Sequence, residues 1–233
     1  RRRKNMKHSV SILILLALCL NCFGQEDEHM DRKALRDSLS QASNVLAYHP
    51  DSLDLRLRKA KWNILLEEWQ YAREEYDYVL NRQPDNVAAL FYRAFVNEKQ
   101  HRYKFARLDL EHLLYVVPGN FEATLGLALL NQKDNRHTEA MNMINLLVEQ
   151  HPANALAYAA RAGMEVEQKL YAPAEYDYGK AIELSPDNTD YLLSRADVRL
   201  RMKDKKGARE DLDRMVSLGI SRASLSAWYA KCK

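Results

Sequence analysis

The chain has 233 residues, of which 47% are hydrophobic, with only 7 glycines and 6 prolines, so its composition excludes a disordered chain and supports a packed interior. The formal net charge of +3 arises in residues 1–24, which carry five basic residues and no acidic one; residues 25–233 hold 30 basic residues against 32 acidic ones. Residues 25–233 are nearly neutral and lack the basic stripe of a nucleic-acid-binding protein. The composition therefore favours a protein or peptide partner.

The first 24 residues have the three regions of a secretory signal peptide. Basic residues precede an 11-residue apolar run from Val10 to Leu20, which is too short to span a bilayer as a helix. Cys22 and Gly24 are small residues suitably placed for cleavage before Gln25. We therefore predict an exported protein, located in a bacterial periplasm or cell envelope or secreted, with residues 1–24 as its signal peptide.

Two alternatives for this segment remain open. It could be an uncleaved amino-terminal anchor, or a lipoprotein signal in which Cys22 or Cys19 is acylated. Leu18 and Asn21, which precede these cysteines, match poorly the small residue that a bacterial lipoprotein signal has at this place. A lipid anchor or an uncleaved leader is the only membrane attachment that the sequence predicts.

Two further residues bear on the ends of the chain. Met6 is a candidate start, in which case residues 1–4 need no functional explanation. After cleavage before Gln25, Cys232 would be the remaining cysteine, and one thiol can form neither an internal disulfide nor a metal cluster.

Residues 25–50 contain the first predicted helix, from Asp31 to Tyr48. Its apolar residues recur at three- and four-residue steps, which indicates one buried face: Leu35, Leu39, Ala42, Val45 and Leu46. In the register of the repeat that follows, this helix corresponds to the second half of a unit. We interpret residues 25–50 as an amino-terminal capping helix.

Five of the six prolines stand 34 residues apart, at Pro50, Pro84, Pro118, Pro152 and Pro186. A fixed period of this length is typical of a stacked helical array, in which no domain boundary is needed. It predicts five helix-turn-helix units, at residues 51–84, 85–118, 119–152, 153–186 and 187–220. Each proline ends a helix, and an Asp, Asn or Ser that follows it can cap the next one, with two capping side chains in Asp51-Ser52.

Two columns of alanine are invariant in this register. Ten residues after each proline stand Ala60, Ala94, Ala128, Ala162 and Ala196. Twenty-two residues after each proline stand Ala72, Ala106, Ala140, Ala174 and Ala208. A small residue at every such position is explained if the two helices of each unit cross closely there.

The alanine columns, the 34-residue unit and the closing proline resemble the tetratricopeptide repeat (TPR) family. The resemblance covers residues 51–220 and implies an all-α, right-handed solenoid whose first helices line a concave groove that binds peptides. One column departs from the family pattern. Thirteen residues after the proline, where the family usually has an aromatic residue, this chain has Asn63, Asn97, Asn131, Glu165 and Arg199.

The last residues, 221–233, are predicted to form a carboxy-terminal capping helix. The fifth unit ends in Leu218-Gly219-Ile220, without a proline. The segment from Arg222 to Lys231 could then form one more helix, with Leu225, Trp228 and Tyr229 on its apolar side. Terminal units of a solenoid are atypical because one face meets water.

The resemblance also implies which residues would contact a peptide. Mapping the family's groove positions onto this sequence gives residues in which Leu and Phe predominate, so an apolar peptide face is favoured. Each of them could instead be a stacking contact between helices. The candidates are Leu57, Lys61, Phe91, Phe95, Leu125, Leu129, Leu156, Leu193 and Asp197.

The sequence contains no motif that indicates an enzyme, a cofactor, a metal site or a small-molecule substrate. His101, His112 and His137 have no His or Cys four residues away, and no phosphate-binding glycine loop or nucleophile motif occurs. The acidic residues between Glu67 and Asp77, and the basic residues between Lys203 and Arg214, are interleaved with opposite charges. We interpret both regions as solvated helix surface.

Taken together, these observations predict a non-enzymatic, exported scaffold that binds a protein or peptide through the concave groove of its repeats. The alternative is a purely structural accessory subunit of a cell-envelope complex, whose groove is covered by its neighbours.

Overall fold

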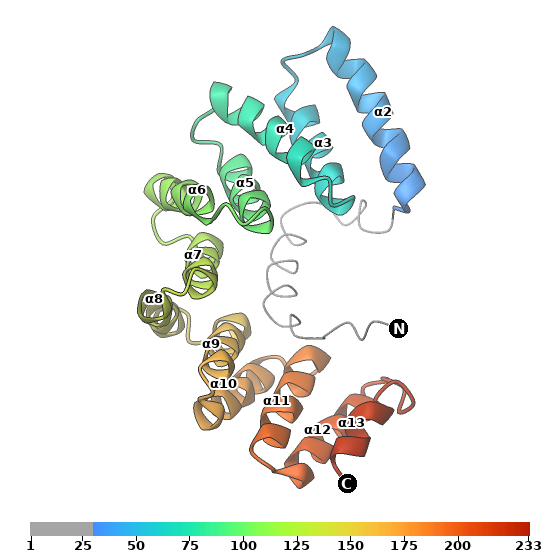
Figure 1. The fold of residues 1–233 in the computed structure, drawn as a ribbon, viewed down its shortest axis with the longest axis vertical. Helices are drawn as coiled ribbons and strands as arrows, with labels where there is room; N and C mark the ends of the chain where they lie inside the picture. Colours follow the sequence, from blue (N-terminus) through green and yellow to red (C-terminus); the bar gives the residue numbers. More distant parts are fainter. Residues whose placement is uncertain (1–29) are drawn as a thin grey trace. The chain divides into compact units, whose positions relative to one another are not determined.

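The computed structural model describes residues 30–233; the predicted signal peptide and the next five residues lie outside the described part. The described residues form α-helices and no strand, which confirms the all-α fold (Figure 1). The helices are α2 (Arg32–Tyr48), α3 (Leu53–Leu65), α4 (Trp69–Arg82), α5 (Val87–Lys99), α6 (Tyr103–Val116), α7 (Phe121–Lys133), α8 (His137–Gln150), α9 (Ala155–Glu167), α10 (Tyr171–Leu184), α11 (Thr189–Arg201), α12 (Lys205–Ser217) and α13 (Ser226–Lys231).

The described chain forms two compact units, residues 30–136 and residues 137–233. In the first unit each helix from α2 to α7 packs against the next, and in the second unit each helix from α8 to α13 does the same (Figure 1). The boundary lies in the turn between α7 and α8, inside the predicted repeat 119–152. The 34-residue period continues through this turn, so no sequence signal marked it.

The amino-terminal helix is close to its predicted position. Asp31 is the N-cap of α2, because its Oδ1 accepts a hydrogen bond of 2.8 Å from the Ala34 amide. Leu35 and Ala42 of α2 are buried in one cluster with Trp62 and Leu66, which places the apolar face of α2 against α3. The helix therefore covers one end of the first unit.

Asparagine side chains begin four of the later helices, as their position after each proline predicts. The Asn86 and Asn120 side chains accept hydrogen bonds from the amides three residues on, at 2.9 and 2.7 Å. Asn154 and Asn188 each accept from two amides. These bonds satisfy amides at a helix start that have no partner within the helix.

The cap predicted from Asp51-Ser52 is wrong. The Ser52 side chain makes no capping hydrogen bond to α3. The Asp51 carboxylate instead accepts hydrogen bonds from the Tyr78 hydroxyl at 3.0 Å and from the Arg82 guanidinium at 3.2 Å. Asp51 therefore links the turn to α4 and does not cap α3.

A turn of one kind joins the two helices of every predicted repeat. Its last residue has a positive φ, between 57° and 67°, at Glu67, His101, Asn135, Lys169 and Lys203. In the fourth repeat, Lys169 N–H donates to the Val166 carbonyl and Leu170 N–H to the Glu165 carbonyl, at 3.0 and 2.8 Å. Equivalent bonds occur in the other four turns and close each helix end.

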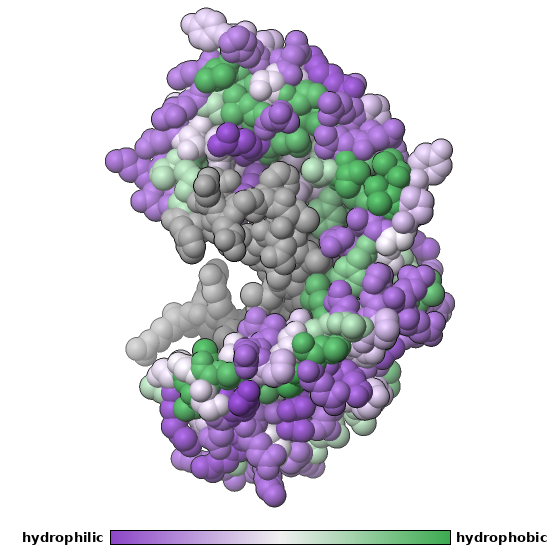
Figure 2. Space-filling model, turned by 180° about the vertical axis from the view of Figure 1, so that it is seen from behind, coloured by the Kyte–Doolittle hydropathy of each residue, from purple (hydrophilic) through white to green (hydrophobic). Residues whose placement is uncertain are grey.

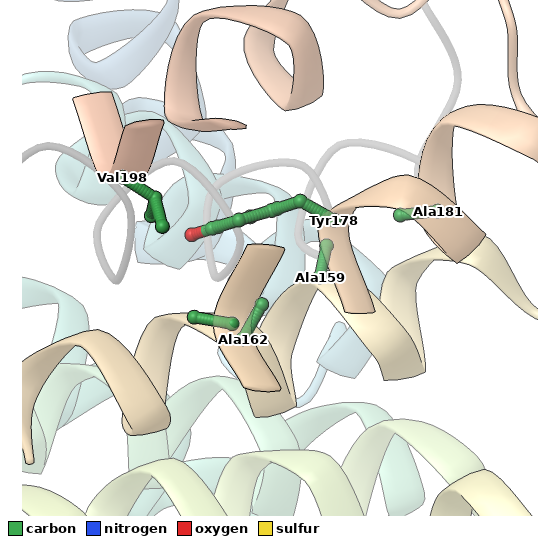
Figure 3. Close-up of a cluster of buried hydrophobic side chains, with 6 residues drawn as sticks. Ala159, Ala162, Tyr178, Ala181 and Val198 are labelled. Atoms are coloured by element: carbon green, nitrogen blue, oxygen red, sulfur yellow. The ribbon is translucent and has the colours of Figure 1, made fainter. Parts of the chain in front are cut away.

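The alanine columns lie at the centre of both units. All ten alanines have an exposed fraction of 2% or less. In the second unit, Ala159 and Ala162 of α9 pack with Tyr178 of α10 and Val198 of α11. Figure 3 shows Tyr178 extending across the two alanines with its hydroxyl toward Val198. The short side chains of α9 leave room for this ring, so the helices can approach closely.

The carboxy-terminal helix is shorter than predicted. Residues 222–225 form turns, and α13 begins at Ser226. Leu225 is nevertheless buried, and Trp228 and Tyr229 pack against the cluster that contains Leu212 and Met215 of α12. The apolar side predicted for this segment therefore covers the end of α12, although fewer residues are helical.

A larger side chain in an alanine column should overpack the helix crossing. Ala162 is fully buried, so we expect Ala162→Leu to lower the free energy of unfolding by about 1–3 kcal/mol. Urea unfolding followed by circular dichroism measures this change. The exposed Ala172 of α10 gives the control, since Ala172→Leu should leave stability within about 0.5 kcal/mol of the wild type. Equal effects of the two substitutions would show that Ala162 is not a close contact.

Candidate functional site

The candidate groove residues of the first unit lie on α3, α5 and α7, in two columns. The two candidates on α3, Leu57 and Lys61, are half-buried. The members on α5 and α7 have an exposed fraction of 8% or less: Phe91, Phe95, Leu125 and Leu129. In this unit the candidates on α3 are therefore half-buried and include a base, whereas those on α5 and α7 are buried and apolar.

The two phenylalanines of α5 take part in helix packing. The ring of Phe95 meets that of Trp69 of α4 edge to face, with centroids 6.0 Å apart, and Lys99 Nζ lies 5.0 Å from the Phe95 centroid. Phe91 meets Tyr92 edge to face at 5.5 Å. Such contacts fix the orientation of the rings. Phe91 and Phe95 are thus stacking contacts as well as groove candidates.

A small hollow of about 20 Å³ lies beside these phenylalanines, between α5, α6 and α7. This volume admits about one water molecule. Glu98 contributes the charged group of the lining, and its carboxylate oxygen Oε1 is paired with Lys133. The remaining lining residues are apolar or glycine: Phe91, Ala94, Phe95, Ala106, Leu110, Gly126 and Leu130.

The candidates of the second unit are more mixed in character. Leu156 lies on α9, and Leu193 and Asp197 lie on α11; all three are half-buried. Leu193 packs at the edge of the cluster that contains Leu192 and Ala196. Asp197 accepts a hydrogen bond of 2.7 Å from Arg201 on its own helix. An apolar ligand would therefore meet less apolar surface here than at α5 and α7.

Four of the predicted repeats contain a buried ion pair that the sequence interpretation missed. A basic residue on the first helix binds an acidic residue 16 positions later on the second helix. The pairs are Lys59–Glu75 at 2.8 Å, Arg93–Asp109 at 2.6 Å, Arg161–Asp177 at 2.5 Å and Arg195–Asp211 at 2.6 Å. The three arginines each donate two hydrogen bonds to their carboxylate, the strong forked geometry.

Two of these acids correct the interpretation of the charged regions as solvated surface. Glu75 is only 8% exposed and is bound by both Arg56 and Lys59. Asp211 is only 2% exposed and is bound by arginines of α11, not by the basic residues around it in the sequence. Both carboxylates face inward, because bases on the preceding helix compensate for their loss of water.

The third predicted repeat has no charge at the two positions that form these pairs. Leu127 stands where the other repeats have Lys or Arg, and Met143 stands where they have Asp or Glu. Base and acid are thus present together or absent together. A comparison of the repeats at 34-residue intervals would have found this signal in the sequence.

Two members of the column that departs from the family pattern donate hydrogen bonds to buried acids. Asn97 Nδ2 donates to Asp109 at 3.1 Å, and Arg199 Nη1 donates to Asp211 at 3.0 Å. A polar donor therefore replaces the aromatic residue of the family at these two positions. Burial raises the pKa of the Asp109 carboxyl above its ordinary value, while hydrogen bonds from Arg93 and Asn97 act in the opposite direction.

The histidines and acids of the described chain do not gather into a metal site. No group of three or more His, Cys, Asp and Glu residues that could hold a metal ion occurs within residues 30–233. His112 Nε2 lies 2.8 Å from Asp85 Oδ1, and His101 Nδ1 lies 3.0 Å from the Tyr103 hydroxyl. In the same part of the chain, no helix has the length and hydrophobicity needed to cross a membrane.

Most of the face drawn in Figure 2 is hydrophilic, with smaller hydrophobic areas between the polar ones. Some apolar residues are exposed on helices that carry no groove candidate. On α6, Phe105 is 51% exposed and Leu108 is 61% exposed. These residues provide a comparison for the groove candidates, because they are apolar, exposed and on a different set of helices.

Comparison with solved structures identifies the fold. A tetratricopeptide repeat protein from Parabacteroides merdae ATCC 43184 matches with a TM-score of 0.71 and 20% identity, over 99% of this chain and 87% of that chain. A thermophilic TPR protein of Thermus thermophilus matches with a TM-score of 0.62 and 16% identity, over 78% of this chain and 98% of that chain.

A third similar structure is YrrB, described as a TPR protein with an unusual peptide-binding site. It matches with a TM-score of 0.51 and 16% identity, over 76% of this chain and 92% of that chain. No family model matches the sequence, and no curated protein matches it significantly. The chain therefore has the fold of TPR proteins, as the prolines and alanines indicated.

Removing the base of one buried pair should destabilise the protein more than removing the whole pair. Arg93→Leu leaves the Asp109 carboxylate buried without its guanidinium, so we expect a loss of about 3–5 kcal/mol in the free energy of unfolding. Adding Asp109→Met installs the residues of the third repeat and should restore most of the loss. Urea unfolding of both variants measures the difference. A double variant no more stable than Arg93→Leu would contradict this account.

Proposed function

We propose that this protein is an exported, non-enzymatic scaffold of the TPR family, which binds a protein or peptide through the inner faces of its first helices. The observation that supports the proposal best is the pair of largely apolar columns on α3, α5 and α7. In one column Leu57, Phe91 and Leu125 recur at 34-residue intervals, and in the other Phe95 and Leu129 follow Lys61 at the same interval. We retain the five repeats at residues 51–84, 85–118, 119–152, 153–186 and 187–220 as part of the proposal, with caps before and after them.

A set of helices that repeats in this way suits an extended or helical segment. Each repeat presents the same positions at the same spacing, so a ligand can meet successive repeats with successive side chains. The residues at these positions then decide specificity. Leu57, Phe91, Phe95 and Leu129 favour an apolar ligand face in the first unit, and the half-buried Lys61 would suit a neighbouring acidic group. The chain is proposed to use no cofactor, small-molecule substrate or nucleic acid.

The second candidate is a purely structural accessory subunit of a cell-envelope complex. The burial of Phe91, Phe95, Leu125 and Leu129 favours this candidate, because side chains exposed by 8% or less offer a partner little area. Under this candidate the half-buried ends of the columns would make no specific contact. The two candidates therefore differ in what a substitution at Leu57 does.

A charge placed on the half-buried end of the apolar column should abolish partner binding. We expect Leu57→Asp to reduce recovery of the partner at least tenfold in a pull-down from the native envelope, since it places a hydrated carboxylate where the proposed ligand face is apolar. Quantitative mass spectrometry measures the recovery. Leu108→Asp, on the exposed face of α6, is the matched control and should retain the partner.

Circular dichroism must show that both variants keep the helical fold. Equal recovery of the partner by Leu57→Asp and Leu108→Asp would contradict binding through the inner face and favour the structural candidate. Loss of the partner with Leu108→Asp alone would place the binding surface on the second helices.

The export proposal rests on residues 1–24 and predicts processing. We expect the mature protein, purified from its native cells, to begin at Gln25, because Cys22 and Gly24 are suited to cleavage before this residue. Intact-mass measurement detects the product. An acylated cysteine at position 19 or 22 would instead indicate the lipid anchor, and an intact leader would indicate the uncleaved anchor. An unprocessed chain found only in the cytoplasm would contradict export.

A further inference from the structure

Glu165 is a buried acid whose role the fold does not explain. It lies near the end of α9 with an exposed fraction of 8%, and within the described chain its Oε2 has no hydrogen-bond partner. A buried polar atom without a partner costs free energy, so such an atom in a native structure calls for an explanation. Glu165 follows Pro152 by thirteen residues, which places it in the same column as Asn97 and Arg199, the two residues that donate to buried acids.

Glu165 and its charged neighbours together contain one more acid than base. From α10, Asp177 interacts with it and disfavours its ionised form. From its own helix, Arg161 favours the ionised form, but this guanidinium already binds Asp177 through two hydrogen bonds. From α8, Asn145 accepts a bond of 3.2 Å from Arg161 and adds no charge. An ionised Glu165 would thus leave a net negative charge inside the unit.

Tyr178 of α10 also interacts with Glu165, and burial raises the pKa of its hydroxyl well above the ordinary value. The tyrosine therefore stays neutral, so it adds no negative charge beside Glu165, and a phenol has no positive form that could compensate for an acid. The base that acts on the pKa of Glu165 is Arg161.

The equivalent residues of two other repeats show a bond that this position can make. Asn97 donates a hydrogen bond to Asp109, and Arg199 donates one to Asp211. A carboxylate cannot donate, but a carboxylic acid has one O–H donor. The neutral form of Glu165 can therefore make the bond to Asp177 that Asn97 makes to Asp109, and the ionised form cannot.

We propose that Glu165 is a proton-dependent latch of the fourth repeat: its neutral acid donates a hydrogen bond to Asp177 and holds α9 against α10, and loss of the proton loosens this pair of helices. The proton taken up is the only covalent change. Because α9 also carries the groove candidate Leu156, the latch would couple the local packing of this inner helix to pH. The inference does not depend on which partner the protein binds.

The titration of Glu165 determines whether the protein becomes more or less stable as the pH rises. Burial, and then the nearby Asp177, raise its pKa from an ordinary value of 4.5 to about 7, against the opposing influence of Arg161. Between these two values the native state binds a proton that the unfolded state has released. The stability contributed by the neutral acid is therefore complete below pH 4.5, falls as the pH rises toward 7, and is lost above it.

Glu165→Gln tests the latch, since an amide keeps a donor at this position and cannot ionise. Relative to this variant, the folding equilibrium constant of the wild type should fall by about two orders of magnitude between pH 5 and pH 8. Urea unfolding at several pH values gives the constants. Glu149→Gln, on the exposed surface of α8, is the charge-matched control and should follow the wild type at every pH. Parallel pH profiles for the wild type and Glu165→Gln would overturn the proposal.

Two direct measurements also test the proposal, and the first of them needs only the wild-type protein. The carbon-13 resonance of the Glu165 carboxyl in the wild type should titrate with a midpoint of about 7. A midpoint near 4.5 would overturn the proposal. At pH 8, amides of α9 and α10 should exchange hydrogen at least tenfold faster in the wild type than in Glu165→Gln. Equal exchange would show that the ionised acid does not loosen these helices.

Discussion

Burial of a carboxylate between two helices is the interaction that fixes the geometry of four of the five predicted repeats. Removing a charged group from water is costly unless a base and further hydrogen bonds replace the water. Asp177 is 1% exposed, and Arg161 reaches it from the preceding helix with two hydrogen bonds. Such a forked contact forms only when the two helices lie at one separation and one rotation about their axes.

The alanine columns and the charged pairs act together. Ala162 on α9 and Ala174 on α10 are fully buried and allow the backbones to approach. Close approach alone leaves the helices free to turn or slide against each other, because small side chains interlock weakly. The pair Arg161–Asp177 removes this freedom. Replacing a buried pair by apolar residues often costs little stability, so we interpret its contribution here as the selection of one arrangement of the helices.

The sequence predicted the fold well because its signals repeat. A proline and two alanines at 34-residue intervals suffice to place the helices, and Asn86 shows that the capping chemistry was also readable. The charged pairs were missed because each member looks like an ordinary surface residue among other charged residues. Only the register of the repeats separates Glu75, which is buried, from Glu74, which is exposed.

Other features could not be predicted, for physical reasons. Ser52 and Asp51 have the residue types of a cap, but the turn directs Asp51 toward Tyr78 and Arg82 on a helix far away in the sequence. The burial of Phe91 and Phe95 depends on rings such as Trp69 that neighbouring helices supply. The resemblance to TPR proteins predicted that these residues lie on the first helices of the repeats. It did not predict the exposed fraction of each side chain, because this depends on the neighbouring helices.

The charged pairs also affect how the chain can misfold. The same chemistry joins the two helices in four repeats, so the first helix of one repeat is chemically suited to the second helix of another. Repeat proteins are prone to such misassembly and to exchange of elements between molecules. The column thirteen residues after each proline does not share this symmetry, because Asn97, Glu165 and Arg199 differ in size and charge. The departure from the family pattern thus gives individual repeats an identity that the shared pair does not.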